Sequence, residues 1–128
     1  MSHLLLDTHA FIWLTENDLK LSDVLRTTID TADLVYLSIA SLWEMAIKLQ
    51  LGKLSLQQDY EMIGAALEDS DILILPISFD DTVYVRNLPL HHRDPFDRIL
   101  IAQSISNSLA IVSADTVFDA YPIRRVWT

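Results

Sequence analysis

Four short runs of almost uninterrupted apolar residues constrain the fold of this chain more than any other feature. They occupy residues 3–6, 34–37, 72–75 and 110–113. Such continuous runs are typical of strands that are buried on both faces. Segments with helical periodicity separate them, and repeated strand–helix units form parallel sheets. The pattern therefore predicts an α/β fold, a three-layer doubly wound parallel sheet of about five strands with helices on both faces.

The expected helices have recognisable starts and stops. They cover residues 9–14, 22–31, 39–51, 57–69, 80–87 and 94–108. Thr8 and Ser22 are expected N-caps, and Asp94 is an N-cap followed by Pro95 at the first helical position. Gly52 is the expected stop of the third helix. After a short turn, residues 123–127 alternate apolar and basic, as an edge strand with one solvated face does.

Composition narrows the class of protein. The chain has 128 residues, which predicts a single domain over 1–128, and its 51% apolar content favours buried strands and a subunit interface. A net charge of −9 excludes nucleic-acid binding mainly through basic residues, and the lack of cysteine excludes thiol catalysis and zinc–thiolate sites. No apolar run is long enough for a membrane span, and the N-terminus lacks a basic region, so the expected location is cytoplasmic.

Four carboxylates are expected at one edge of the sheet. Asp7 follows the first strand, Glu44 lies in the helix after the second, Asp97 begins the helix before the fourth, and Asp115 follows the fourth. Ligands of such sheets gather beyond the carboxyl ends of the strands. Clustered carboxylates repel one another unless a cation compensates them, and hard oxygen ligands favour Mg²⁺ or Mn²⁺. Asp119 lies further from the strand end than Asp115.

Each of these carboxylates also has an ordinary structural interpretation. Glu44 can pair with Lys48 at i, i+4 or close a capping box with Ser41. Asp97 can be the N3 partner of the Asp94 cap. The other two can be a helix cap and a turn residue. Their joint placement is what favours a site.

Four segments resemble the successive motifs of PIN-domain proteins, and most closely those of VapC-type toxins of toxin–antitoxin pairs. They are LLLDTH (4–9), SLWEMAIK (41–48), RDPFDRILIAQ (93–103) and IVSAD (111–115). The resemblance implies a metal-dependent ribonuclease whose acidic quartet is Asp7, Glu44, Asp97 and Asp115. It also implies supporting roles for Thr8 beside the first aspartate, for Ser113 in orienting the last, and for Asp94 as a cap and outer-shell group.

The resemblance further implies hydrolysis of RNA phosphodiesters by a water that Mg²⁺ or Mn²⁺ activates. Lys48 and Arg98 are the nearest candidates to contact RNA phosphate; alternatively Lys48 pairs with Glu44, or both are solvated helix residues. Loop histidines are usually surface residues, so His9, His91 and His92 are left out of catalysis.

The expected partners are RNA, a cognate antitoxin and a second copy of the chain. Candidate residues for an antitoxin groove are Trp13, Leu14, Trp43 and Ile47. A non-catalytic PIN-fold interaction module and a housekeeping nuclease without antitoxin remain alternatives. A phosphoacceptor receiver is disfavoured because the third strand ends in Pro76-Ile77-Ser78, and an Asp-x-Asp phosphatase because Asp7-Thr8-His9 lacks the second aspartate.

Overall fold

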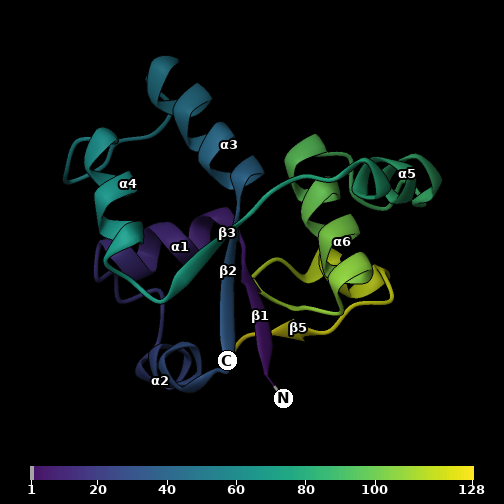
Figure 1. Ribbon diagram of the computed structural model, residues 1–128, viewed down its shortest axis with the longest axis horizontal. Helices are drawn as coiled ribbons and strands as arrows, with labels where there is room; N and C mark the ends of the chain where they lie inside the picture. Colours follow the sequence, from purple (N-terminus) through teal and green to yellow (C-terminus); the bar gives the residue numbers. More distant parts are fainter. Residues whose placement is uncertain (1) are drawn as a thin grey trace.

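The computed structural model describes residues 2–128 as one parallel sheet between two layers of helices (Figure 1). The five strands are β1 (His3–Leu6), β2 (Leu34–Ser38), β3 (Ile72–Leu75), β4 (Ala110–Val112) and β5 (Arg125–Val126). Their order is β3-β2-β1-β4-β5, and every neighbouring pair is parallel. This confirms the predicted three-layer, doubly wound α/β fold.

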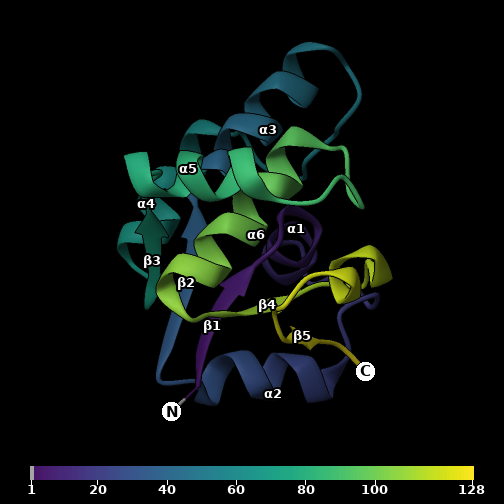
Figure 2. The same ribbon diagram turned by 90° about the vertical axis from the view of Figure 1, so that its right-hand side faces the viewer.

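Six α-helices and one 3-10 helix cover the sheet (Figure 2). They are α1 (Thr8–Thr15), α2 (Asp23–Thr31), α3 (Ile39–Gln50), α4 (Glu61–Glu68), α5 (Phe79–Asn87), α6 (Pro95–Asn107) and η1 (Thr116–Ala120). Helices α1 to α4 supply the apolar residues of a larger core on one face. Helix α6 and η1 supply those of a smaller core on the other face, and α5 packs on α6.

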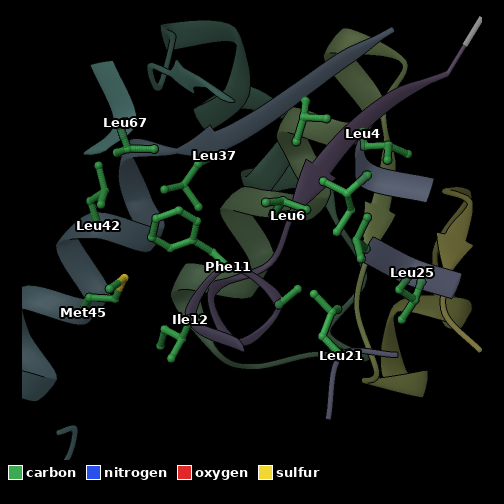
Figure 3. Close-up of a cluster of buried hydrophobic side chains, with 14 of the residues drawn as sticks. Leu4, Leu6, Phe11, Ile12, Leu21, Leu25, Leu37, Leu42, Met45 and Leu67 are labelled. Carbon is green, nitrogen blue, oxygen red and sulfur yellow. The ribbon is translucent and has the colours of Figure 1, made fainter. Parts of the chain in front are cut away.

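Strand β1 lies at the centre and is buried from both sides. Leu4 and Leu6 point into the larger core, where Phe11 of α1 is also fully buried (Figure 3). Leu5 points the other way and packs with Ile111 in the smaller core. Successive side chains alternate across a strand, so a strand with apolar residues at every position needs a core on each face.

The residues expected to begin and end the helices were mostly correct. Ser22 and Asp94 are N-caps, and Gly52 follows the end of α3 with a φ of 70°. The cap of α1, however, is Asp7 and not Thr8: the Asp7 carboxylate accepts a hydrogen bond from the Ala10 N–H. A carboxylate in this position satisfies a free amide of the first turn, which leaves the Thr8 hydroxyl for another partner.

Two elements are shorter than expected. Helix α4 begins at Glu61 instead of residue 57, because Leu56 packs against the larger core from a loop and Tyr60 provides no side-chain cap. Strand β5 is an edge strand of two residues within the predicted 123–127. None of the helices within residues 2–128 has the length and apolar character that crossing a bilayer requires.

Candidate metal centre

The sheet topology brings the predicted carboxylates together at the carboxyl ends of the strands. Asp7 follows β1 and caps α1, Asp115 follows β4 and caps η1, Asp97 lies in the first turn of α6, and Glu44 lies in α3. Electrostatic effects on Asp97 come from Asp94, Glu44, Asp7 and Asp115, so these groups share one neighbourhood. Neighbouring strands β1 and β4 place two of the aspartates side by side.

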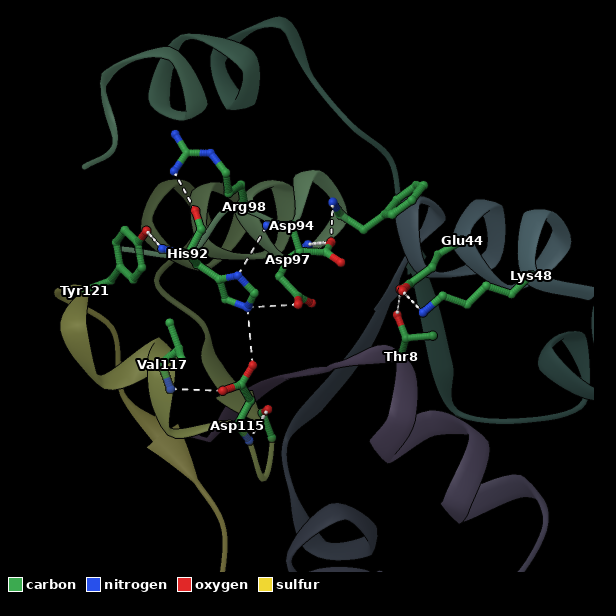
Figure 4. A network of polar contacts seen from close by, with 12 residues as sticks. Thr8, Glu44, Lys48, His92, Asp94, Asp97, Arg98, Asp115, Val117 and Tyr121 are labelled. Atoms are coloured by element: carbon green, nitrogen blue, oxygen red, sulfur yellow. Dashed lines mark hydrogen bonds and ion pairs between the residues drawn. The ribbon is translucent and has the colours of Figure 1, made fainter. Parts of the chain in front are cut away.

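His92 connects two of these carboxylates (Figure 4). Its Nε2 atom lies 3.0 Å from Oδ2 of Asp97 and 3.2 Å from Oδ2 of Asp115. One ligand-type atom from each of the three residues lies within 4.8 Å of the others. This group, drawn from the loop before α6, from α6 and from the loop after β4, is the best-defined part of the centre.

Glu44 belongs to a buried polar group at the other side of the centre. Its Oε1 accepts a hydrogen bond of 2.6 Å from the Thr8 hydroxyl, and its Oε2 accepts one of 2.6 Å from the Lys48 ammonium (Figure 4). The Ser41 hydroxyl lies 3.0 Å from that of Thr8. The expected i, i+4 pair of Glu44 and Lys48 therefore forms, whereas α3 is capped by Ser38, which rules out a capping box with Ser41.

Two aspartates resist ionisation in the metal-free protein. Burial, followed by the charges of neighbouring carboxylates, raises the pKa of Asp97 to about 8. Burial also raises the pKa of Asp7, although the Ser113 hydroxyl and the Ala10 N–H lower it. A buried carboxyl surrounded by like charges releases its proton less readily than a solvated one. The centre thus carries more carboxylates than it can hold ionised without a cation.

Asp94 and Ser113 orient the aspartates through the backbone. The Oδ1 atom of Asp94 accepts hydrogen bonds from the N–H groups of Phe96 and Asp97, at 2.9 and 3.1 Å. The Oγ atom of Ser113 accepts one of 3.0 Å from the Asp115 N–H. Asp94 therefore fixes the first turn of α6, and Ser113 fixes the loop that carries Asp115.

Asp119 is held away from the group that includes Asp115. It forms an ion pair with Arg125, with the two nitrogen–oxygen distances at 2.9 and 3.1 Å. Arg125 also donates to the Ser113 carbonyl. Of the two aspartates after β4, Asp115 is the one that contacts His92.

Arg98, the second candidate for a contact with RNA phosphate, is occupied by backbone acceptors. Its guanidinium is buried and donates hydrogen bonds to the carbonyls of Val85, Leu88, Pro89 and His92, at 2.9 to 3.3 Å. A guanidinium has several donors in a fixed fork and needs acceptors for them when it is buried. Arg98 therefore fastens the loop between α5 and α6 and faces away from the carboxylates.

The contact of His92 with the aspartates was missed from the sequence. A histidine in a loop is more often a surface residue, and nothing in its spacing distinguishes His92 from His91, which is exposed. The available signal was its position two residues before the Asp94 cap, because a helix cap fixes the path of the chain that enters it.

The residues present fit a divalent cation. The cluster offers carboxylate oxygens, which suit Mg²⁺ and Mn²⁺, together with one imidazole. The raised pKa values of Asp97 and Asp7 report unbalanced negative charge that a cation would relieve. Asp97 and Asp115 are the best placed to hold the ion, with Asp7 beside them, while Glu44 is engaged by Lys48 and Thr8.

Comparisons with known proteins agree with this architecture. The family model described as PIN domain matches residues 4–123. A DNA-bound VapBC from Salmonella typhimurium is 18% identical with a TM-score of 0.68, covering 98% of both chains. A toxin–antitoxin complex from Klebsiella pneumoniae is 17% identical with a TM-score of 0.68, covering 97% of this chain and 96% of the other. The PIN domain endonuclease Utp24 is 14% identical with a TM-score of 0.52, covering 98% and 86%. No curated protein sequence matches significantly.

Proposed function

The chain belongs to the PIN-domain family, and from this premise we propose that it is an Mg²⁺- or Mn²⁺-dependent endoribonuclease that acts as the toxin of a toxin–antitoxin pair. One observation carries the proposal. Carboxylates from four separate elements meet at the carboxyl edge of the sheet, and their crowding raises the pKa of Asp97 to about 8. PIN domains are in general metal-dependent nucleases, and such a carboxylate cluster is what that chemistry requires.

The residues of the centre have different roles in this proposal. A bound divalent ion lowers the pKa of water and stabilises the charge that develops on a phosphodiester during its hydrolysis. Asp97, Asp115 and Asp7 hold the ion. Thr8 and Lys48 hold the Glu44 carboxylate in place at the other side of the centre. The chain would need no large basic surface, because a divalent cation held by these carboxylates would supply the positive charge for the phosphate.

Lys48 is the remaining basic candidate for a phosphate contact. Its side chain is 38% exposed and its ammonium lies 2.6 Å from Glu44 Oε2, with the charges of Asp94 and Asp97 nearby. It holds its charge, because the hydrogen bond to Glu44 raises its pKa while burial lowers it less. A cation at this position offsets part of the repulsion between an incoming phosphate and the acidic centre.

An antitoxin is the proposed protein partner. The Salmonella and Klebsiella structures are, by their descriptions, a VapBC and a toxin–antitoxin complex. Among the groove candidates, Trp13 and Leu14 pack against the larger core, whereas Trp43 is 60% exposed and contacts Phe96 edge-on at 5.2 Å. Trp43 thus lies against the residue that precedes Asp97, and it offers an antitoxin segment an exposed apolar contact close to the centre.

A second copy of the chain is the other proposed partner. The free edge strand β3 exposes Leu73 and Ile74, each 46% exposed. Helix α4, which packs on β3, adds the exposed side chain of Met62. An exposed strand edge with apolar neighbours is a surface that soluble proteins usually cover.

The test is cleavage of a pool of structured RNAs by protein freed of any copurified partner. Wild type is compared with Asp97→Asn and with Asp119→Asn, a matched change in an exposed aspartate that pairs with Arg125. Cleavage that requires Mg²⁺ or Mn²⁺, is lost in Asp97→Asn and persists in Asp119→Asn supports the proposal. A well-folded wild type that binds no metal and cuts no RNA overturns it and favours the interaction module. Cleavage by a chain encoded without an antitoxin favours the housekeeping nuclease.

A further inference from the structure

His92 is held in place by contacts other than those of its ring nitrogens with the carboxylates. Its backbone N–H donates a 2.7 Å hydrogen bond to the Tyr121 hydroxyl, which itself donates to the Pro89 carbonyl at 2.8 Å. Its carbonyl accepts a 3.1 Å hydrogen bond from Arg98. Its ring packs against the fully buried Phe118 with centroids 5.5 Å apart. A surface histidine would not need such an anchor.

The contacts of the ring nitrogens assign its protons. Nδ1 accepts a hydrogen bond of 3.4 Å from the backbone N–H of Asp94, so Nδ1 presents a lone pair. Because a donor faces Nδ1, the nitrogen that carries the ring hydrogen is Nε2. Nε2 faces Oδ2 of Asp97 and Oδ2 of Asp115, at 3.0 and 3.2 Å. The ring is thus a donor shared by two carboxylates.

This arrangement differs from that of a histidine that binds a metal. A ligating histidine donates the N–H of its other nitrogen to a carboxylate, a carbonyl or water, which frees the first nitrogen for the ion. The other nitrogen of His92 meets the Asp94 N–H, a donor, so Nε2 keeps its hydrogen. We propose that His92 is a positioning residue whose Nε2–H holds Asp97 and Asp115 at a metal-binding separation without binding the ion itself.

The need for such a residue follows from where the two carboxylates come from. Asp97 is on α6 and Asp115 follows β4, and the elements that carry them are joined through the ring of His92. Two crowded carboxylates without a shared donor repel each other once both are ionised, and ion binding must then bring them together. Removing an outer partner of a metal ligand typically costs about 10–100-fold in metal affinity. The inference rests on the proposed metal-dependent function.

The experiment measures Mn²⁺ affinity by titration calorimetry for the full chain and four variants. His92→Ala removes the donor, His92→Gln places an amide N–H near the position of Nε2, and His92→Asn places one near Nδ1 instead. His91→Ala is the matched control, because His91 is the exposed neighbour and its ring packs edge-on against Tyr121 while the Tyr121 hydroxyl bonds to the His92 backbone and not to its ring. The expected result is affinity weakened about 10–100-fold in His92→Ala and His92→Asn, largely restored in His92→Gln and unchanged in His91→Ala.

A second readout asks directly whether His92 binds the ion. Electron spin echo envelope modulation of bound Mn²⁺ detects imidazole nitrogen only when that nitrogen is a ligand. No such modulation is expected in wild type; modulation that disappears in His92→Gln overturns the inference. Equal affinity in wild type and a folded His92→Ala also overturns it. If the affinities follow the expected order while wild type cuts no RNA, the positioning role of His92 stands and the nuclease proposal fails. If wild type cuts RNA while the His92 variants bind Mn²⁺ as tightly as wild type, the nuclease proposal stands and the positioning role fails.

Discussion

Replacing Asp97 by asparagine is expected to stabilise the metal-free protein while it abolishes activity. Asp97 is mostly buried, and its burial and then the charges of Asp94, Glu44, Asp7 and Asp115 raise its pKa to about 8. Asparagine has nearly the same shape and its carbonyl can still accept from His92, but it has no charge to bury. The variant therefore keeps the packing and loses the electrostatic cost.

The size and sign of the effect follow from the pKa. The ordinary value for the Asp97 carboxyl is 3.8, and the folded value is about 8. Between these values the folded protein holds a proton that the unfolded chain has released, so the free energy of unfolding falls as the pH rises. Each pH unit costs about 1.4 kcal/mol, so from pH 4 to pH 7 wild type loses about 4 kcal/mol that Asp97→Asn does not lose. Asp7, whose pKa is also raised, acts in the same direction in both proteins and cancels in the difference.

Urea unfolding in EDTA at pH 4, 5.5 and 7 measures this difference. We expect Asp97→Asn and wild type to be equally stable at pH 4 and to separate steadily above it, with the variant more stable. His92 and Lys48 face the same centre in both proteins, and Asp119→Asn controls for the loss of one surface charge. Saturating Mn²⁺ should reverse the order, because an ion that binds only the folded state stabilises it. Parallel curves at all three pH values would refute the reasoning.

Three further outcomes are expected. Arg98→Met should lower the free energy of unfolding by about 3 kcal/mol in urea titrations, because it leaves four backbone carbonyls without their shared donor. A decrease of less than about 1 kcal/mol, which is typical of a surface substitution, would contradict this expectation. Lys48→Met should destabilise the EDTA-treated protein by about 1–2 kcal/mol, a modest effect because the ammonium is partly solvated, and Mn²⁺ should restore part of the loss. Asp115→Ala should abolish Mn²⁺ binding in calorimetry, whereas Asp119→Ala should leave it intact, because Asp115 lies at His92 in the centre and Asp119 pairs with Arg125. Equal losses of affinity in the two variants would show that the metal site has been assigned to the wrong residues.

The sheet was predictable because its strands are apolar at nearly every position. A strand that is buried on both faces is apolar at every position, so it appears in the sequence as a continuous apolar run. The runs around Leu5 and Ile111 therefore identify β1 and β4 directly. The same reasoning fails for β5, where only Arg125 and Val126 pair with β4 and the flanking residues pack as a loop. It also fails for α4, whose start has no side-chain cap to mark it.

The carboxylates of the centre were predictable from topology, but their partners were not. Parallel strands end at one edge, so the positions of Asp7 and Asp115 followed from the strand order alone. The contacts of His92 and Arg98 depend on how the loop between α5 and α6 closes over α6, and no local pattern encodes that path. The sequence therefore did not indicate that Arg98 binds backbone carbonyls or that His92 contacts the carboxylates.

The doubly covered central strand gives the centre two halves that are held in different ways. Backbone amides of β1 bond to strands on both sides, and the Asp7 N–H continues the ladder to the Val112 carbonyl at 3.1 Å. Amides of this kind exchange with solvent only when the whole domain opens, whereas loops held by side chains open locally. Asp7 is therefore held by the backbone ladder of the sheet, while His92 is held by the side chains of Arg98 and Tyr121. Changes at Arg98 or Tyr121 would then displace the His92 side of the centre and leave the Asp7 side in place.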